Sequence, residues 1–303
     1  MGGYVTEDIT SEVDLFDSIM QQNIIENEFN LEYASLATIQ HGAPIEFMVK
    51  GSNELYLDLK NSRLHVLAKI TNADGSNIEA NTAGPINLPL HSMFREISVE
   101  LNGRYVSDTS PLYPYRAYRK TLLNFSKETQ DTGLQCEGWT KESSGNMDVT
   151  AVAAANASMN TRAVTFAKST VVKLVSRIQL DLFHQDRLIP LGIDLHIKLI
   201  PATDSIVCKS AGSGAGAAQQ NYIMAIQQIN HIIHTKQLTS TAQMAHKKLL
   251  HIQNMQMHYS RIKVKHLSII ANQTSISLDN VFTGALPNMV IVNSVSDLGH
   301  AGG

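Results

Sequence analysis

Short runs in which apolar and polar residues alternate are the dominant pattern along this chain. Because successive side chains of a β-strand point to opposite faces, this alternation is typical of strands with one buried face and one polar face. Turn residues separate the runs, which favours short strands joined by loops. The pattern predicts strands over Ile45–Val49, Leu55–Leu59, Leu64–Ile70, Ile97–Leu101, Ile178–Leu182 and Ile193–Leu199.

The connections between these runs carry their own signals. Residues 72–75 (Asn-Ala-Asp-Gly) indicate a turn, because Asp and Gly tolerate the backbone angles that a reversal requires. The dipeptide Asn102-Gly103 is typical of a two-residue β-hairpin. Residues 140–163 are rich in Ala, Ser, Asn and Thr without a clear period, so we expect a surface loop there.

One stretch, residues 115–123, has helical spacing. Tyr115, Tyr118 and Leu122 would share a face of that helix, which favours packing against the neighbouring strands. The same stretch interleaves arginines with tyrosines, so stacking on single-stranded nucleic acid is the alternative interpretation. We therefore expect a short helix after the Asn102-Gly103 hairpin.

These elements predict an all-β protein with a jelly-roll β-sandwich. A jelly roll needs eight strands, and strand patterns after the Gly- and Ala-rich stretch are too few for a second one. The later patterns are Ile262 with Val264, Ile276 with Leu278, and Val290 with Val292. The predicted domains are an acidic N-terminal arm (1–40), a complete first jelly roll (41–201), a Gly/Ala/Ser-rich linker (202–220) and an incomplete second jelly roll (221–303).

Charge is strongly segregated, although the net charge of the 303 residues is only −3. Residues 1–49 contain nine acidic residues and no Lys or Arg, whereas residues 205–278 contain no Asp or Glu and seven bases. The asymmetry suggests either a contact between unlike surfaces of two subunits or a basic face toward nucleic acid. Polar strands that simply face solvent would also produce it. The candidate contact residues are Lys236, Lys247, Lys248, Arg261, Lys263 and Lys265.

No organised catalytic, cofactor or metal site is evident, and we expect the protein not to be an enzyme. Cys136 and Cys208 lie outside any metal-binding or disulfide pattern, which favours a reducing compartment. Residues 212–217 fit GxGxxA, but no acidic residue follows at the spacing that a ribose requires. His231 and His234 would share a face on a helix and point to opposite faces on a strand, and no carboxylate nearby completes a metal site. 

We expect no secretory signal. The first twenty residues contain five acidic residues and no Lys or Arg, unlike a secretory signal. No apolar run approaches 18 residues, so membrane insertion is not expected.

Several ordered motifs resemble those of one family, the major capsid proteins of Polintons (Mavericks) and the related adintoviruses. The resemblance covers most of residues 43–297. The motifs are Ala43-Pro44-Ile45-Glu46-Phe47, Gly51-Ser52, Tyr56-Leu57-Asp58-Leu59, Leu64-His65-Val66, Gly84-Pro85-Ile86-Asn87, Leu90-His91-Ser92-Met93-Phe94, Leu101-Asn102-Gly103, Tyr113-Pro114-Tyr115-Arg116-Ala117-Tyr118, Leu180-Asp181-Leu182-Phe183, Gln185-Asp186-Arg187, Leu278-Asp279-Asn280-Val281-Phe282 and Gly284-Ala285-Leu286-Pro287.

The resemblance implies a double jelly-roll fold of the adenovirus-hexon lineage. It further implies homotrimers that form pseudo-hexagonal capsomers, which contact neighbouring capsomers and a penton-type minor capsid protein in the icosahedral shell of a virion. The family has no catalytic residues to carry over. The basic segment would then face packaged DNA or an acidic arm of a neighbour.

Two alternatives remain at this stage. One is a β-sandwich module that binds a glycan or protein ligand through its loops, including the loop near Trp139. The other is a domesticated or truncated capsid-derived protein that no longer forms shells.

Overall fold

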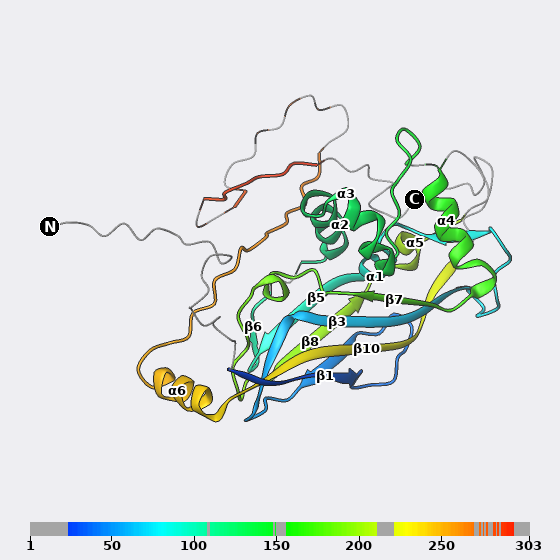
Figure 1. Cartoon of the computed structure of the whole chain (residues 1–303). Coiled ribbons are helices and arrows are strands. Elements are labelled where there is room, and N and C mark those ends of the chain that lie inside the picture. Colours follow the sequence, from blue (N-terminus) through cyan, green and yellow to red (C-terminus); the bar gives the residue numbers. More distant parts are fainter. Residues whose placement is uncertain are drawn as a thin grey trace, which may run out of the picture.

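The computed structural model of this chain contains two four-stranded antiparallel sheets that lie face to face (Figure 1). The structure describes residues 24–107, 110–147, 149, 156–210, 221–269, 273, 275, 277, 281–282, 284 and 286–293. The strands are β1 (Ile25–Ala34), β2 (Ile45–Val49), β3 (Leu55–Asn72), β4 (Ala83–Pro85), β5 (Phe94–Leu101), β6 (Arg104–Tyr105), β7 (Val172–Ser176), β8 (Leu195–Pro201), β9 (Cys208–Ser210) and β10 (Tyr222–Leu238).

The order of the strands defines a jelly roll. One sheet has the order β1-β10-β3-β7 and the other has the order β2-β8-β5-β6. The first and last of these eight strands, β1 and β10, therefore pair with each other, and the pairing proceeds inward along the sequence to the β5–β6 hairpin. Eight strands in this arrangement make a complete jelly roll, and the short β4–β9 pair lies outside it.

The core lies between the two sheets and follows the predicted alternation. Ile45, Phe47 and Val49 of β2 are at most 4% exposed, while the residues between them are only partly buried. Their neighbours on β8, Leu195 and Ile197, are fully buried. Burial of each such side chain stabilises the fold by about 1.5 to 3 kcal/mol, so this face-to-face layer supplies much of the driving force.

β3 is one long strand where the sequence predicts two. Residues 59–62 lie opposite the single residue Ile233 of β10, which makes a wide bulge in the ladder. The Ser62 hydroxyl donates to the Asp58 carbonyl (2.7 Å) and accepts from the His234 amide (3.2 Å), so the bulge keeps its backbone groups bonded. The gap between the two apolar runs is therefore this bulge and not a turn.

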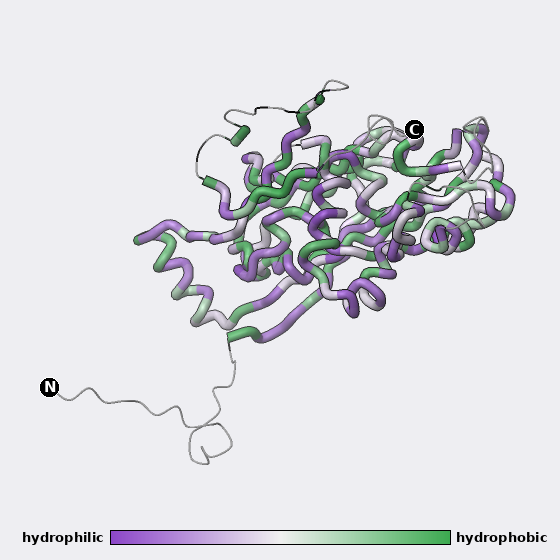
Figure 2. Tube along the Cα trace, turned by 90° about the horizontal axis from the view of Figure 1, so that it is seen from above, coloured by the Kyte–Doolittle hydropathy of each residue, from purple (hydrophilic) through white to green (hydrophobic). Residues whose placement is uncertain are grey.

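The helices gather at one side of the sandwich, except α6, which stands apart at the opposite end (Figure 1). Seen from above, α6 again lies beside the main body, with hydrophobic and hydrophilic residues along it (Figure 2). The α-helices are α1 (Pro89–Ser92), α2 (Tyr113–Asn124), α3 (Lys127–Asp131), α4 (Ala157–Thr165), α5 (Asp204–Val207) and α6 (Ser240–Leu250). The 3-10 helices are η1 (Gly133–Glu137), η2 (Ala167–Ser169) and η3 (Asp181–His184).

Several predicted elements are confirmed. Five of the six predicted strands fall on β2, β3, β5 and β8, and two of the five lie in β3. The hairpin at Asn102-Gly103 joins β5 to β6 with positive φ at both residues, as its turn type requires. Helix α2 matches the predicted helix, but its buried face differs: it buries Tyr113, Arg116, Ala117 and Thr121, whereas Leu122 is 47% exposed.

Two local predictions are wrong. The predicted strand Ile178–Leu182 is irregular backbone that leads into η3, and Leu180, Leu182 and Phe183 are all buried there. The predicted loop 140–163 contains most of α4, whose start is capped by the Asn156 side chain. Small and polar residues on the buried face of α4 hide its helical period.

The predicted domain boundaries also need correction. Residues 25–34, placed in the acidic arm, form β1, and residues 222–238, placed in the second roll, form β10 between β1 and β3. The first jelly roll is therefore closed by strands from outside 41–201. The Gly/Ala-rich stretch lies between β9 and β10, and residues 211–220 are outside the described part.

Candidate assembly surface

The six predicted contact residues lie in three separate places. Lys236 is on β10, Lys247 and Lys248 are on α6, and the other three lie on the extended segment that follows α6. The six residues therefore belong to three different elements of the fold. Each location has a different chemical character.

Lys236 is engaged within the chain. Its ammonium lies 3.1 Å from the Glu28 carboxylate of β1 and 3.5 Å from that of Asp58. The hydrogen bond from Lys236 and its positive charge hold the pKa of Glu28 below its usual value. The acidic N-terminal stretch and the basic segment thus meet between β1 and β10 of one chain, so Lys236 is not a free contact residue.

Helix α6 presents an apolar and basic surface to solvent. The Thr239 side chain caps its start by accepting from the Ala242 amide (3.4 Å), and no residue of the helix is buried. Lys247 and Lys248 occupy the last turn, where positive charge is favourable. We define the α6 surface by its exposed apolar residues: Met244 (57% exposed), Leu249 (48%), Leu250 (51%) and Ile252 (81%).

Little attaches α6 to the sandwich. The His246 ring makes an edge contact with Tyr56 of β3, and its Nδ1 lies 3.0 Å from the Tyr56 hydroxyl. Exposed apolar side chains on a helix that few contacts hold to its own chain are normally covered by another surface. The α6 surface is accordingly the strongest candidate for a protein contact among the described residues.

The segment after α6 runs along the side of the sandwich (Figure 1). The Ile262 amide donates to the Asp181 carboxylate (3.0 Å), and Arg187 donates to the Gln256 carbonyl. Ile262 is half-buried, whereas Lys263 is exposed.

This segment is extended but unpaired, so the predicted strand at Ile262 and Val264 is not formed, although the alternation of burial is real. Arg261 and Lys263 are exposed, and the Lys265 ammonium lies 5.7 Å from the centre of the Phe282 ring. Ile276 and Leu278 lie outside the described residues, and Val290 and Val292 are exposed without strand pairing.

Sequence reasoning missed the buried polar residues that hold these segments. Arg116 and Asp181 form an ion pair with side chains 6% and 10% exposed, and Asp181 also binds the Ile262 amide. Arg116 is therefore unavailable for nucleic-acid stacking. Because the two residues are 65 positions apart, no local sequence pattern marks them as partners.

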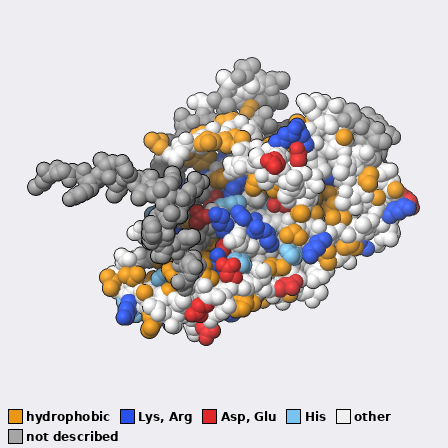
Figure 3. Space-filling view, in the orientation of Figure 1, with side chains coloured by type: hydrophobic (Ala, Val, Ile, Leu, Met, Phe, Trp, Pro, Cys, Tyr) orange, Lys and Arg blue, Asp and Glu red, His pale blue; other side chains and the backbone are white. Residues whose placement is uncertain are grey.

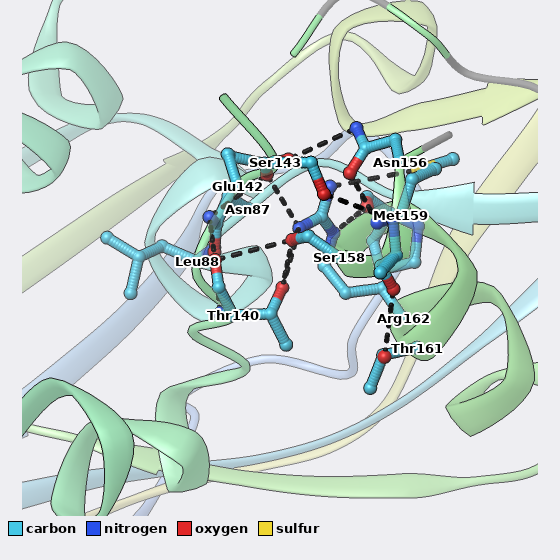
Figure 4. A network of polar contacts seen from close by, with 12 residues as sticks. Asn87, Leu88, Thr140, Glu142, Ser143, Asn156, Ser158, Met159, Thr161 and Arg162 are labelled. Atoms are coloured by element: carbon cyan, nitrogen blue, oxygen red, sulfur yellow. Dashed lines mark hydrogen bonds and ion pairs between the residues drawn. The ribbon is translucent and has the colours of Figure 1, made fainter. Parts of the chain in front are cut away.

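A second buried network centres on Arg162 of α4 (Figure 4). Its guanidinium donates to the Glu142 carboxylate (2.7 Å), the Thr140 hydroxyl (2.6 Å) and the Pro85 carbonyl (2.9 Å). These bonds join α4, β4 and the segment between η1 and α4. Because the guanidinium already donates within the protein, the network fits a structural role better than a catalytic one.

The histidines and the tryptophan with potential for metal or ligand binding lie in different parts of the structure. His231 and His234 are on β10 and point to opposite faces, with His231 fully buried. Trp139 is 3% exposed and packs with Leu88 and Leu134. Residues 212–217 lie outside the described part.

Within the described ranges, no group of three or more His, Cys, Asp or Glu side chains is placed to hold a metal ion. In the same part of the chain, no helix has the length and apolar character that a bilayer crossing requires.

Comparison with known proteins gives distant similarities. No family model matches the chain. The uncharacterized protein F54H12.2 of Caenorhabditis elegans is 20% identical over 273 residues, which cover 87% of this chain and 62% of that protein. The chain thus spans less than two thirds of that relative.

Among solved structures, a chain of the Sputnik virophage is similar with a TM-score of 0.50 and 9% identity, over 78% of this chain and 53% of that one. The Faustovirus major capsid protein has a TM-score of 0.46 and 10% sequence identity, over 79% of this chain and 59% of that chain. The mavirus major capsid protein has a TM-score of 0.41 and 14% sequence identity, over 78% of this chain and 51% of that chain. Together with the strand order, the Sputnik similarity establishes the fold of this chain as an all-β jelly-roll sandwich.

Proposed function

We propose that this chain is a structural subunit of a viral-type shell, related to the double jelly-roll capsid proteins of Polintons and adintoviruses. In this proposal three copies form a pseudo-hexagonal capsomer, capsomers contact one another and a penton-type minor protein, and the assembled shell places the protein in a virion. The role is structural and not enzymatic.

The complete jelly roll is the observation that carries the proposal. The strand order of this chain defines the roll, and a chain in the structure of the Sputnik virophage has a similar fold. A sandwich of this type has four open sheet edges, at β1, β7, β2 and β6, which neighbouring copies can cover. The sequence motifs shared with capsid proteins support the same role.

The α6 surface supports self-association. Met244, Leu249 and Leu250 are about half exposed and belong to a helix without buried residues. Burial of such a surface between copies would contribute to a stable interface, because apolar area removed from water favours association. Lys247 and Lys248 at the same helix end could meet an acidic surface of a neighbour or packaged DNA.

Sedimentation velocity of the purified chain tests the proposal. We expect a trimer for the wild type and a shift toward monomer for the double variant Leu249→Ser/Leu250→Ser. The matched control is Leu123→Ser, which alters a 61% exposed leucine at the end of α2, away from α6. A wild-type chain that stays monomeric at every salt and protein concentration contradicts the proposal.

Contact with DNA is a separate element of the proposal and needs its own measurement. Charge reversal at Lys247 and Lys248 should weaken binding to DNA or impair trimer formation. Fluorescence anisotropy of labelled DNA measures DNA binding, and sedimentation measures trimer formation. If both are unchanged in Lys247→Glu/Lys248→Glu, the exposed lysines of α6 contribute to neither.

The alternatives are less well supported. A glycan-binding module would need an exposed aromatic platform, and Trp139, the single tryptophan, is buried beside Leu134. Saturable binding on a glycan array would favour that alternative. A copy that no longer forms shells is distinguished by the sedimentation experiment.

A further inference from the structure

Buried polar atoms without hydrogen-bond partners are concentrated beside α2. Across the described residues there are eight such side-chain atoms, and four of them belong to Arg116, Arg177, Gln179 and His184. Native proteins pair nearly all buried polar groups, so a cluster of exceptions requires an explanation. We call the region between α2 and the β7–η3 connection the α2–η3 seam.

The backbone brings these side chains together. Arg116 lies on α2 and binds Asp181 at the start of η3, which fixes α2 against this connection. The Gln179 amide donates to the hydroxyl of Tyr113 at the start of α2 (3.1 Å). Arg177 lies two residues before Gln179. The floor of the seam is deeply buried, since Arg116 is 6% and Gln179 is 1% exposed.

The rim of the seam is partly open and positively charged. Lys120, one turn after Arg116 on α2, is partly exposed, as are Arg177 and His184. On the face of the molecule seen in Figure 3, Lys and Arg side chains lie near the middle, among Asp, Glu and His side chains.

The charges on this rim repel one another. Burial lowers the pKa of Lys120 to about 8, and the charges of Arg116 and Arg177 contribute. Burial lowers the pKa of His184 to about 3, with further contributions from Lys120 and Arg177.

The nearby carboxylates are committed elsewhere. Asp181 pairs with Arg116, and Glu137 lies 3.2 Å from the Nε2 of His91. Within the described part of the chain, no carboxylate lies within ion-pair distance of Lys120 or Arg177. Asp181 lies close enough to Lys120, and Glu137 and Asp58 close enough to Arg177, to act on their pKa values without forming ion pairs. The seam therefore holds two cations without an ion-pair partner among the described residues, and the Nε–H groups of Arg116 and Arg177 have no acceptor.

We propose that the α2–η3 seam binds a small dianionic oxyanion of the phosphate class. Lys120 and Arg177 have no ion-pair partner among the described residues and are partly exposed. Together they match the charge of one dianion, and the exposed ends of both side chains can donate N–H groups to its oxygens. The partial burial of both Lys120 and Arg177 favours a small ion over a polymer backbone. This site is independent of the proposed shell function.

Inorganic phosphate is the probe for the test. Thermal unfolding is measured with increasing sodium phosphate and, at matched ionic strength, with sodium chloride. Phosphate at high concentration stabilises many proteins without binding, so the informative result is saturation at low millimolar concentration. We expect a saturable rise in Tm of at least about 2 °C, by mass action on the folded state.

Variants test whether Lys120 and Arg177 are responsible for the rise in Tm with phosphate. The saturable rise should disappear in Lys120→Met/Arg177→Met and persist in Lys173→Met, a matched control on the exposed face of β7. Without phosphate, Lys120→Met should be at least as stable as the wild type, because the substitution removes an unpaired, partly desolvated charge. Calorimetric titration of the wild type with phosphate should give about one site per chain.

Two results would overturn the proposal. One is equal responses of the wild type to phosphate and chloride, and the other is an unchanged phosphate response in the double variant. If the double variant does not fold, calorimetry on the wild type decides: saturable binding supports the site, and no heat of binding removes it.

Discussion

His231 gives the sharpest test of the sandwich core. Its imidazole is fully buried between the rings of Phe47 and Phe183, each with its centroid 6.0 Å away, and neither ring nitrogen has a hydrogen-bond partner. A polar group left unsatisfied in this way costs about 1 to 3 kcal/mol. The substitution His231→Leu removes the cost with a side chain of similar volume, so the variant should fold at least as stably.

The way in which the stability of the fold changes with pH tests the buried His231 more specifically than the stability at a single pH. Burial lowers the pKa of His231 to about 3, and the charge of His65 contributes. In the unfolded chain the pKa of a histidine is about 6.5. Between these values the unfolded state binds a proton that the folded state excludes, so this group destabilises the fold as the pH falls. From about pH 7 to about pH 4.5 the loss amounts to about 2.5 kcal/mol.

The assay is urea unfolding followed by far-UV circular dichroism at these two pH values. Other titrating groups are common to both proteins, so the difference between variant and wild type isolates His231. We expect the stability advantage of His231→Leu to grow by about 2.5 kcal/mol at the lower pH. The control His251→Leu, at an exposed histidine, should show no such growth. An advantage that is the same at both pH values would refute the account of this buried, unprotonated ring.

Three further predictions follow from the same structure. Arg162→Met should cost about 3 to 5 kcal/mol in urea unfolding, because it leaves the Glu142 carboxylate buried and unpaired. The double variant Arg162→Met/Glu142→Gln should recover part of that loss, and no recovery would contradict the pairing. Asp181→Asn should speed tryptic cleavage near Ile262 by weakening the bond that holds this segment, and an unchanged cleavage rate would argue against it. Gly138→Ala should destabilise the chain by at least about 1 kcal/mol, since φ is +81° and the new Cβ would lie 2.4 Å from a proline ring carbon; a melting temperature equal to that of the wild type would contradict this steric argument.

The sequence was most informative where one face of a strand is buried and the other is polar. Ile45 to Val49 and Leu195 to Leu199 follow that rule, and their strands formed as predicted. β1 escaped prediction because it is an edge strand with mostly exposed residues, so its pairing with β10 imposes no apolar period. On β10 the inward positions include His231 and Thr235, both fully buried, which conceal the alternation.

The polar interactions could not be predicted for a different reason. Arg116 and Asp181 meet only because the roll brings α2 against η3, and neither residue has a local pattern that marks its partner. The same holds for Lys236 and Glu28, which come from distant parts of the chain. The segregated charge of the sequence suggested a contact between unlike surfaces of two subunits, whereas the pair between Lys236 and Glu28 arises from the pairing of β1 with β10 within one chain.

The central claim, that this jelly roll is a shell subunit, is tested most directly by single-particle electron microscopy of the purified chain at concentrations where sedimentation detects oligomers. The account predicts particles with threefold symmetry in which the α6 surface is covered by a neighbouring copy. Isolated sandwiches with Leu249 and Leu250 in contact with solvent, at all concentrations, would contradict it.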